Sequence, residues 1–181
     1  EINDEMLKKV FKLNEKYNKL AEEDEDVHRN INWKLKKLAW NNLFNYGEDN
    51  VIDFEDLHGT VGIFGKNYSG KSSVIDSLLF TLFNSTSKNE RKNVNVINQN
   101  KDAASGLAEI EIAGDTYIIQ RDLEKYTKKL KGVTSIEART NVEFLKHNTE
   151  SGETTSLNGL TRNDTDKNIR RIFGTLEDFL S

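Results

Sequence analysis

The 181-residue sequence contains no cysteine, no proline and no long apolar run. The absence of cysteine excludes disulfide bonds and thiolate metal sites, and it fits a reducing compartment. No apolar run approaches the roughly twenty residues that a membrane-spanning helix needs, so we expect no membrane partner. A formal net charge of −4 excludes a global basic field that would attract nucleic acid, but it leaves room for a local basic patch.

Two kinds of site find no support in the residue pattern. The three histidines, His28, His58 and His147, lack partners at the spacing of metal ligands, so we expect surface or structural roles for them. The sequence also lacks an Asn-Lys-x-Asp run, and guanine-specific GTPase chemistry is therefore unsupported.

The most informative segment runs from Gly65 to Ser72 and fits G-x-x-x-x-G-K-[ST], the phosphate-binding P-loop. Its glycines let successive backbone N–H groups point at phosphate oxygens. The apolar run Thr60–Phe64 before it predicts a buried strand. The broad apolar face after it predicts a helix, whose dipole aims its positive end at the same anion. The residues of that face are Val74, Ile75, Leu78, Leu79, Leu82 and Phe83.

The motif predicts a role for each of its residues. We expect Lys71 to be the catalytic cation that reaches the β- and γ-phosphates, and Ser72 to bind Mg²⁺. Backbone N–H groups from Asn67 to Lys71 would cradle the phosphates, and Ser73 would contact the α-phosphate. The predicted binding residues are Gly65, Lys66, Asn67, Tyr68, Ser69, Gly70, Lys71, Ser72 and Ser73.

Upstream of the motif we predict a helix and two strands. Residues 1–27 form an amphipathic pattern that ends in an acidic run, and we expect a domain boundary at residue 30. Residues 33–44 and 51–54 read as strands that are joined by a polar turn. Residues 84–106 are polar and nearly aperiodic, which predicts a long surface loop.

Downstream, alternating patterns predict antiparallel strands. The strands are expected over residues 108–112, 117–121 and 136–144, with a polar turn region over 149–158. Asp164 or Thr165 is expected to cap a short helix that Gly174 ends. Thr175–Asp178 resembles a capping box, which predicts that a new helix begins there.

Two further constellations bear on chemistry. ATP hydrolysis needs an acidic residue at the end of a second buried strand. The nearest candidate, Ile110–Asp115, alternates like a half-exposed antiparallel strand, so we do not expect it to serve. The basic run Lys125–Lys131 is compatible with contact to a nucleic-acid backbone, but a solvated β-loop explains it better.

Residues 38–73 resemble the N-terminal segment of ABC-type ATPase heads of the SMC class, above all the SbcC-type double-strand-break repair ATPases and related phage recombination subunits. The likeness is carried by Trp40–Gly47, Ile52–Phe54 and Gly62–Ser73, and Asn67 with the double serine at 72 and 73 is its most distinctive part. It extends loosely to an antiparallel β-subdomain. Two departures are the lack of a basic residue near Phe44 or Asn45, and Tyr68 where many members have glycine.

The resemblance implies a mixed α/β P-loop NTPase fold, with residues 31–181 as the N-terminal half of a split head, truncated before the glutamine loop and the coiled coil. ATP and Mg²⁺ would lie between two heads. DNA, a calcineurin-like nuclease of the SbcD type and a second ATPase head would be partners. The setting would be the cytoplasm of a bacterium or a phage-infected cell.

The same resemblance leaves the isolated chain without the parts needed for hydrolysis, and two alternatives stay open. One is a self-contained P-loop kinase or NTPase with an unrecognised acidic strand. The other is a non-catalytic nucleotide- or DNA-binding module.

Overall fold

A computed structural model describes residues 33–66, 70–87, 92–130, 132–176 and 178. The N-terminal helix predicted over 1–27 lies outside these residues, and the domain boundary at residue 30 stays a prediction. The described residues all belong to one unit, Trp33–Ser181.

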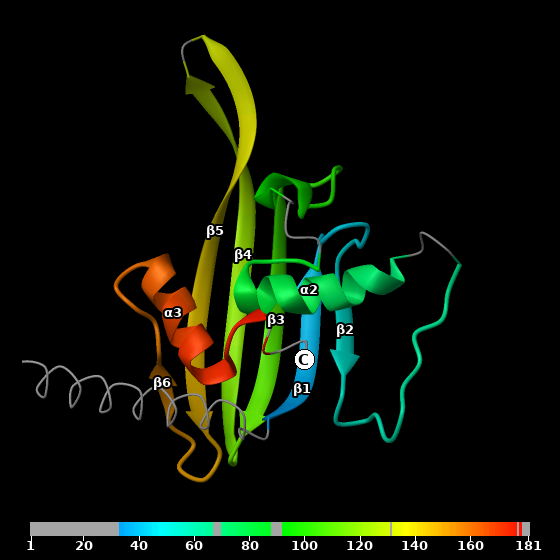
Figure 1. Cartoon of the computed structure of the whole chain (residues 1–181), viewed down its shortest axis with the longest axis vertical. Coiled ribbons are helices and arrows are strands. Elements are labelled where there is room, and N and C mark those ends of the chain that lie inside the picture. Colours follow the sequence, from blue (N-terminus) through cyan, green and yellow to red (C-terminus); the bar gives the residue numbers. More distant parts are fainter. Residues whose placement is uncertain (1–32, 67–69, 88–91, 131, 177, 179–181) are drawn as a thin grey trace, which may run out of the picture. The chain divides into compact units, whose positions relative to one another are not determined.

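The unit is built on one antiparallel sheet with the strand order β2-β1-β3-β4-β5-β6 (Figure 1). The strands are β1 (Trp33–Asn41), β2 (Asn50–Asp53), β3 (Ala103–Ile112), β4 (Asp115–Leu130), β5 (Val133–Asn148) and β6 (Thr154–Ser156). Most neighbours follow one another in sequence. The strands β1 and β3 also pair, with Leu38 opposite Ala108, although the whole phosphate-loop region lies between them in the sequence.

The β4–β5 hairpin reaches beyond the rest of the sheet (Figure 1). The strand β3 begins opposite Glu124, so residues 125–130 of β4 pair with β5 only. Gly132 has a φ of 81°, a left-handed conformation that glycine adopts without strain. Residues 125–130 of the basic run therefore lie on this two-stranded arm, and Lys131 lies outside the described residues.

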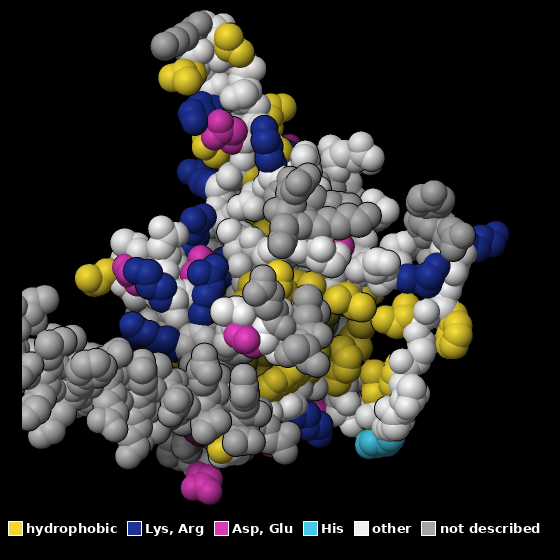
Figure 2. All heavy atoms as spheres, viewed as in Figure 1, with side chains coloured by type: hydrophobic (Ala, Val, Ile, Leu, Met, Phe, Trp, Pro, Cys, Tyr) yellow, Lys and Arg dark blue, Asp and Glu magenta, His cyan; other side chains and the backbone are white. Residues whose placement is uncertain are grey.

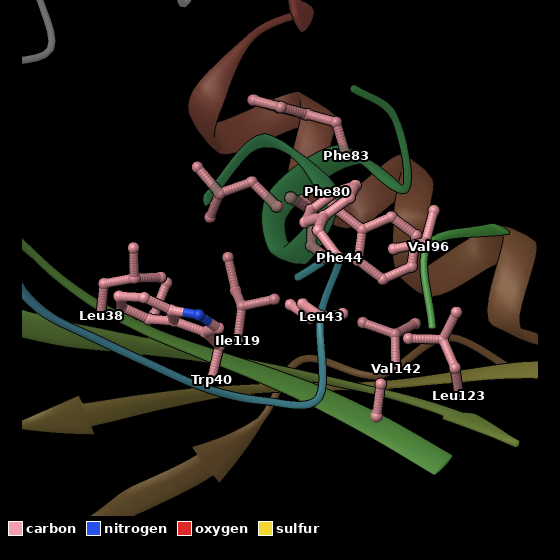
Figure 3. Close-up of a cluster of buried hydrophobic side chains, with 14 of the residues drawn as sticks. Leu38, Trp40, Leu43, Phe44, Phe80, Phe83, Val96, Ile119, Leu123 and Val142 are labelled. Atoms are coloured by element: carbon pink, nitrogen blue, oxygen red, sulfur yellow. The ribbon is translucent and has the colours of Figure 1, made fainter. Parts of the chain in front are cut away.

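Two helices cover one face of the sheet: α2 (Lys71–Phe83) and α3 (Arg162–Phe173). Inward-facing strand residues and α2 share one apolar core (Figure 3). The figure labels Leu38, Trp40, Leu43, Phe44, Phe80, Phe83, Val96, Ile119, Leu123 and Val142. At the crossing of α2 over β3 the two elements approach closely, because a Cβ on Gly106 would overlap the hydroxyl oxygen of Thr81.

A fully buried arginine joins the two helices to the sheet. Arg121 on β4 donates from Nε to the Thr81 carbonyl (3.0 Å) and from Nη2 to the Leu82 carbonyl (3.3 Å), near the end of α2. Nη2 also donates to Asp166 on α3 at 2.7 Å. Burial lowers the pKa of Arg121, and the Asp166 carboxylate acts in the opposite direction.

Several predicted elements are confirmed. The strands at 33–44 and 51–54, the hairpin at 108–121 and the strand at 136–144 all form. The strand β1 ends earlier than predicted, at Asn41, whereas β3, β4 and β5 are longer, and the predicted turn region 149–158 contains the short strand β6. Gly174 ends α3 with a φ of 76°. Thr175 and Asp178 exchange the capping-box hydrogen bonds, with the Thr175 N–H donating to Asp178 Oδ2 at 2.7 Å.

Three predictions are wrong. Thr60–Phe64 is not a strand: it has no ladder partner among the described residues, and Phe64 is 94% exposed. The loop 84–106 is shorter than predicted, because β3 begins at Ala103 and the 3-10 helix η1 (Asn93–Asn95) leads into the buried Val96 and Ile97. Thr161, not Asp164 or Thr165, caps α3 through a capping box with Asp164. Within the described residues, no helix is long and apolar enough to cross a membrane.

Candidate nucleotide-binding site

The predicted phosphate loop leads directly into α2. Gly65 and Lys66 are exposed on its entry side, and Gly70 is the buried N-cap of the helix. Gly70 has a φ of 93°, which a residue with a side chain adopts only under strain. This conformation begins the helix at Lys71, so the N–H groups of its first turn face the loop. Asn67, Tyr68 and Ser69 lie outside the described residues.

Lys71 connects the two sides of the loop. Its ammonium donates to the carbonyl oxygens of Gly65 at 2.6 Å and Lys66 at 2.7 Å. The side chain therefore turns back from the first residue of the helix over the beginning of the motif. A cation held there lies where the motif requires positive charge, so its position fits a polyphosphate ligand.

The two serines lie on the first turn of α2. Ser72 is exposed, which leaves its hydroxyl open to a ligand such as Mg²⁺. Ser73 is half-buried; its N–H donates to the Gly70 carbonyl at 2.9 Å, and its own carbonyl accepts from Ser77 Oγ at 2.7 Å. In the described part of the chain, no three His, Cys, Asp or Glu side chains gather into a metal site.

Tyr46 contacts the C-terminal end of the loop, at Gly70, and the sequence did not reveal this contact. Its hydroxyl donates to the Gly70 carbonyl at 3.1 Å. Its ring lies edge-on to Trp40, with the ring centroids 5.1 Å apart. A Cβ on Gly70 would come within 3.3 Å of the Tyr46 ring, so glycine is needed for this approach as well as for its φ.

The turn that carries Tyr46 is fixed by asparagine side chains. Asn98 Nδ2 donates to the Tyr46 carbonyl at 3.0 Å, and Asn50 Nδ2 donates to the Gly47 carbonyl at 2.8 Å. Lys101 and Glu48 form an ion pair at 2.7 Å, and this lysine lowers the pKa of the Glu48 carboxyl. The Tyr46 carbonyl is thus held by a side chain that lies 52 positions downstream in the sequence.

The other candidates are not brought to the loop. Ile110–Asp115 is antiparallel, as expected: Glu111 lies 3.8 Å from Lys36 in an ion pair, and Asp115 lies 2.8 Å from Lys146. On the β4–β5 arm, Lys128 pairs with Glu137 at 3.2 Å, and Lys125 donates to three carbonyls, among them that of Lys101 at 2.5 Å.

An exposed apolar surface lies beside the phosphate loop (Figure 2). We define it by the exposed large apolar side chains of residues 51–75, which are Val51, Leu57, Val61, Ile63, Phe64 and Ile75. Figure 2 shows hydrophobic side chains gathered beside α2 and on the neighbouring segment. Exposed large apolar side chains are therefore frequent in this segment of the chain.

The phosphate-loop motif leads into a helix that lies over an antiparallel sheet. This arrangement and the residues on which the resemblance rests place the chain in the class of SMC-like, ABC-type P-loop ATPase heads, with a mixed α/β fold. The chain belongs to the family AAA_23, an AAA domain, whose model matches residues 37–181. This match and the Rad50 and SbcC relatives described next together confirm the expected family resemblance.

Three curated proteins are similar to the chain. An uncharacterized protein, R555, of Acanthamoeba polyphaga mimivirus is 34% identical over 152 residues, which are 82% of this chain and 11% of that protein. A DNA double-strand break repair Rad50 ATPase of Sulfolobus acidocaldarius is 36% identical over 90 residues, 49% of this chain and 10% of its own length. The SbcC subunit of the nuclease SbcCD of Clostridium acetobutylicum is 26% identical over 152 residues, 76% of this chain and 13% of its own length. The chain thus spans about a tenth of the length of these relatives.

Among solved structures, the recombination mediator protein RecF with ATP resembles part of the fold. The TM-score is 0.44 at 15% sequence identity, and the match covers 60% of this chain and 28% of RecF.

Proposed function

We propose that the chain is the ATP–Mg²⁺-binding lobe of an SMC-like ATPase that acts in DNA double-strand-break repair or recombination. The observation that carries the proposal is the position of Lys71, whose ammonium lies 2.6 and 2.7 Å from the carbonyls at the loop entry while its backbone begins α2. The names of the Rad50 and SbcC relatives support the choice of ATP and of DNA repair.

The residues of the site would act by charge and orientation. Lys71 would leave the two carbonyls and neutralise charge on the β- and γ-phosphates, while the first-turn N–H groups of α2 hold phosphate oxygens. The exposed Ser72 hydroxyl would join the coordination shell of Mg²⁺, which supplies further neutralisation when it is bound. Gly65, Lys66 and Gly70 would form the backbone cradle, with Asn67, Tyr68 and Ser69 completing it, and Ser73 would contact the α-phosphate.

The one strand that the sequence offered as a source of the catalytic acid is antiparallel, and its acidic side chains form ion pairs. We therefore propose that hydrolysis requires a second lobe that supplies the acid and covers the exposed apolar surface. In the assembled protein a second head, DNA and an SbcD-type nuclease would be the partners, in the cytoplasm of a bacterial or phage-infected cell.

Nucleotide binding by the 181-residue chain tests the proposal. Titration calorimetry with ATP and Mg²⁺ should show weak, saturable binding, since the isolated chain supplies only one side of the site. Lys71→Ala should weaken this binding about 10- to 100-fold, because a hydrogen-bonded charge is lost. Lys129→Ala is the matched control, since Lys129 is an exposed lysine on the β4–β5 arm and its loss should leave the affinity unchanged. Equal affinities of wild type and Lys71→Ala would contradict the assignment of the site.

A turnover assay on the same chain separates the alternatives. We expect no ATP hydrolysis until the second lobe is added. Hydrolysis by the chain alone that disappears in Lys71→Ala would instead indicate a self-contained P-loop kinase or NTPase. Salt-dependent DNA binding that survives Lys71→Ala but falls when Lys128 and Lys129 are neutralised would indicate a DNA-binding module.

A further inference from the structure

The phosphate loop is held at both ends, but by different elements. At its entry, Lys71 bonds to the Gly65 and Lys66 carbonyls. At its exit, the Tyr46 hydroxyl bonds to the Gly70 carbonyl, which also accepts the Ser73 N–H at 2.9 Å. The entry contact comes from within the motif, whereas the exit contact comes from the turn between β1 and β2.

We propose that Tyr46 is a positioning residue of the phosphate loop, a role that rests on the proposed function. Its hydroxyl fixes the carbonyl of Gly70, the N-cap of α2. The position of this carbonyl sets the direction of the first-turn N–H groups, and it also sets the direction in which the Lys71 and Ser72 side chains point. Tyr46 acts through Gly70, and it need not touch the nucleotide.

Three observations favour a positioning role over simple packing. First, the hydroxyl bonds the one carbonyl at which the loop becomes a helix. Second, Gly70 has no Cβ, which lets the ring approach this backbone. Third, Tyr46 is anchored apart from the loop, by the edge-on contact with Trp40 and by Asn98. A side chain that is fixed to the sheet can hold the N-terminus of α2 at a set place relative to the sheet.

This role makes a prediction about which part of a nucleotide is affected. Tyr46→Phe keeps the ring and removes only the hydroxyl, so every ligand that uses the phosphate loop should lose affinity by the same factor. We expect a loss of about 3- to 10-fold, the equivalent of one hydrogen bond, for Mg²⁺–ATP and for inorganic tripolyphosphate with Mg²⁺. Tripolyphosphate has no base or ribose, so it reports on the phosphate loop alone.

Titration calorimetry on the 181-residue chain tests the prediction, with urea unfolding to show that the variant is folded. Tyr126→Phe is the matched control, because the Tyr126 hydroxyl donates to Glu137 at 2.9 Å on the arm, and its loss should leave both affinities unchanged. The expected unfolding midpoint of Tyr46→Phe stays high enough for measurement, because the ring and its contact with Trp40 remain.

Each result has a separate meaning. Equal losses for both ligands support the positioning role. A loss for ATP alone would place Tyr46 at the base or ribose and overturn it, as would unchanged affinities for both ligands. If the wild type binds neither ligand, the proposed function fails, and the role of Tyr46 fails with it. If the wild type binds both ligands and Tyr46→Phe binds them with the same affinities, only the positioning role is overturned.

Discussion

At the scale of single residues, Arg121 is the most consequential side chain away from the phosphate loop. It is fully buried, and it satisfies two carbonyls near the end of α2 and the Asp166 carboxylate at once. Removing one partner of a buried ion pair leaves the other charge without compensation in a medium of low polarity.

We therefore predict that Arg121→Met lowers the free energy of unfolding by about 3–5 kcal/mol. Arg139→Met is the control, because Arg139 and Glu124 form an exposed ion pair at 2.8 Å, and the substitution should change the same quantity by less than about 1 kcal/mol. Urea denaturation of both variants measures the difference. Similar values for the two variants would show that the buried network contributes little.

At this scale the sequence suggests a role for each residue of the motif, and these roles stay predictions, but it does not reveal the contacts around the motif. The spacing of Gly65, Gly70 and Lys71 is local, so it can be read directly. Tyr46 lies 24 residues from Gly70, and Arg121 lies 40 residues from Thr81, and only the fold brings these pairs together. An aromatic residue in a turn that precedes a P-loop is a weak signal, and an arginine in an alternating strand suggests exposure.

At the scale of elements, the crossing of α2 over β3 sets the place of the phosphate-loop helix on the sheet. Gly106 allows this crossing, because any Cβ there would overlap the Thr81 hydroxyl. Thr81 has little freedom to move, since its hydroxyl donates to the Ser77 carbonyl at 2.7 Å inside the helix.

Gly106→Ala should therefore destabilise the protein by about 1–3 kcal/mol, the usual cost of an overpacked core. The double variant Gly106→Ala with Thr81→Ala should recover part of this loss, because the overlapping oxygen is removed. Gly47→Ala serves as control, since nothing lies within 4 Å of its Cβ position. Thermal unfolding of the wild type and these three variants measures the effect. An unfolding temperature of Gly106→Ala equal to that of the wild type would contradict the packing argument.

The prediction of helices and strands succeeded where the sequence pattern is local. It failed where residues that are distant in the sequence determine the structure. The β3–β4 hairpin follows from alternation and a glycine turn, so its two strands form as predicted, and the fold adds the register of Ile110 with Tyr117. Thr60–Phe64 has the composition of a buried strand, but a strand needs hydrogen-bonding neighbours, and the described residues supply none there. The buried Val96 and Ile97 were missed because two apolar residues in a polar stretch have no period.

At the scale of the whole described unit, six of the twelve exposed large apolar side chains belong to residues 51–75, the segment that contains the phosphate loop. Phe64 is 94% exposed within the exposed apolar surface, and Leu160, which is fully exposed before α3, lies outside it. Because both side chains are open to water, replacing either one should change the free energy of unfolding by no more than about 0.5 kcal/mol.

Self-association should distinguish the two positions. We predict that Phe64→Ser lowers the tendency of the chain to associate at rising concentration, because it interrupts a surface of several apolar side chains. Leu160→Ser should leave association unchanged. Sedimentation velocity over a range of concentrations measures both, and an equal effect of the two substitutions would speak against a specific apolar surface.

The pairing of β1 with β3 also has a consequence for the order of folding. The strands β3, β4 and β5 join neighbours along the chain, whereas the register of Asn41 with Ser105 closes a loop of more than sixty residues. Closing a long loop costs conformational entropy before the contacts that it brings together can form. We therefore expect the strands β3, β4 and β5 to pair first and the β1–β3 ladder to form later. The phosphate loop, Tyr46 and α2 all lie inside that closure. The capacity to hold a nucleotide is therefore expected to arise late on the folding pathway, as a product of the last long-range closure.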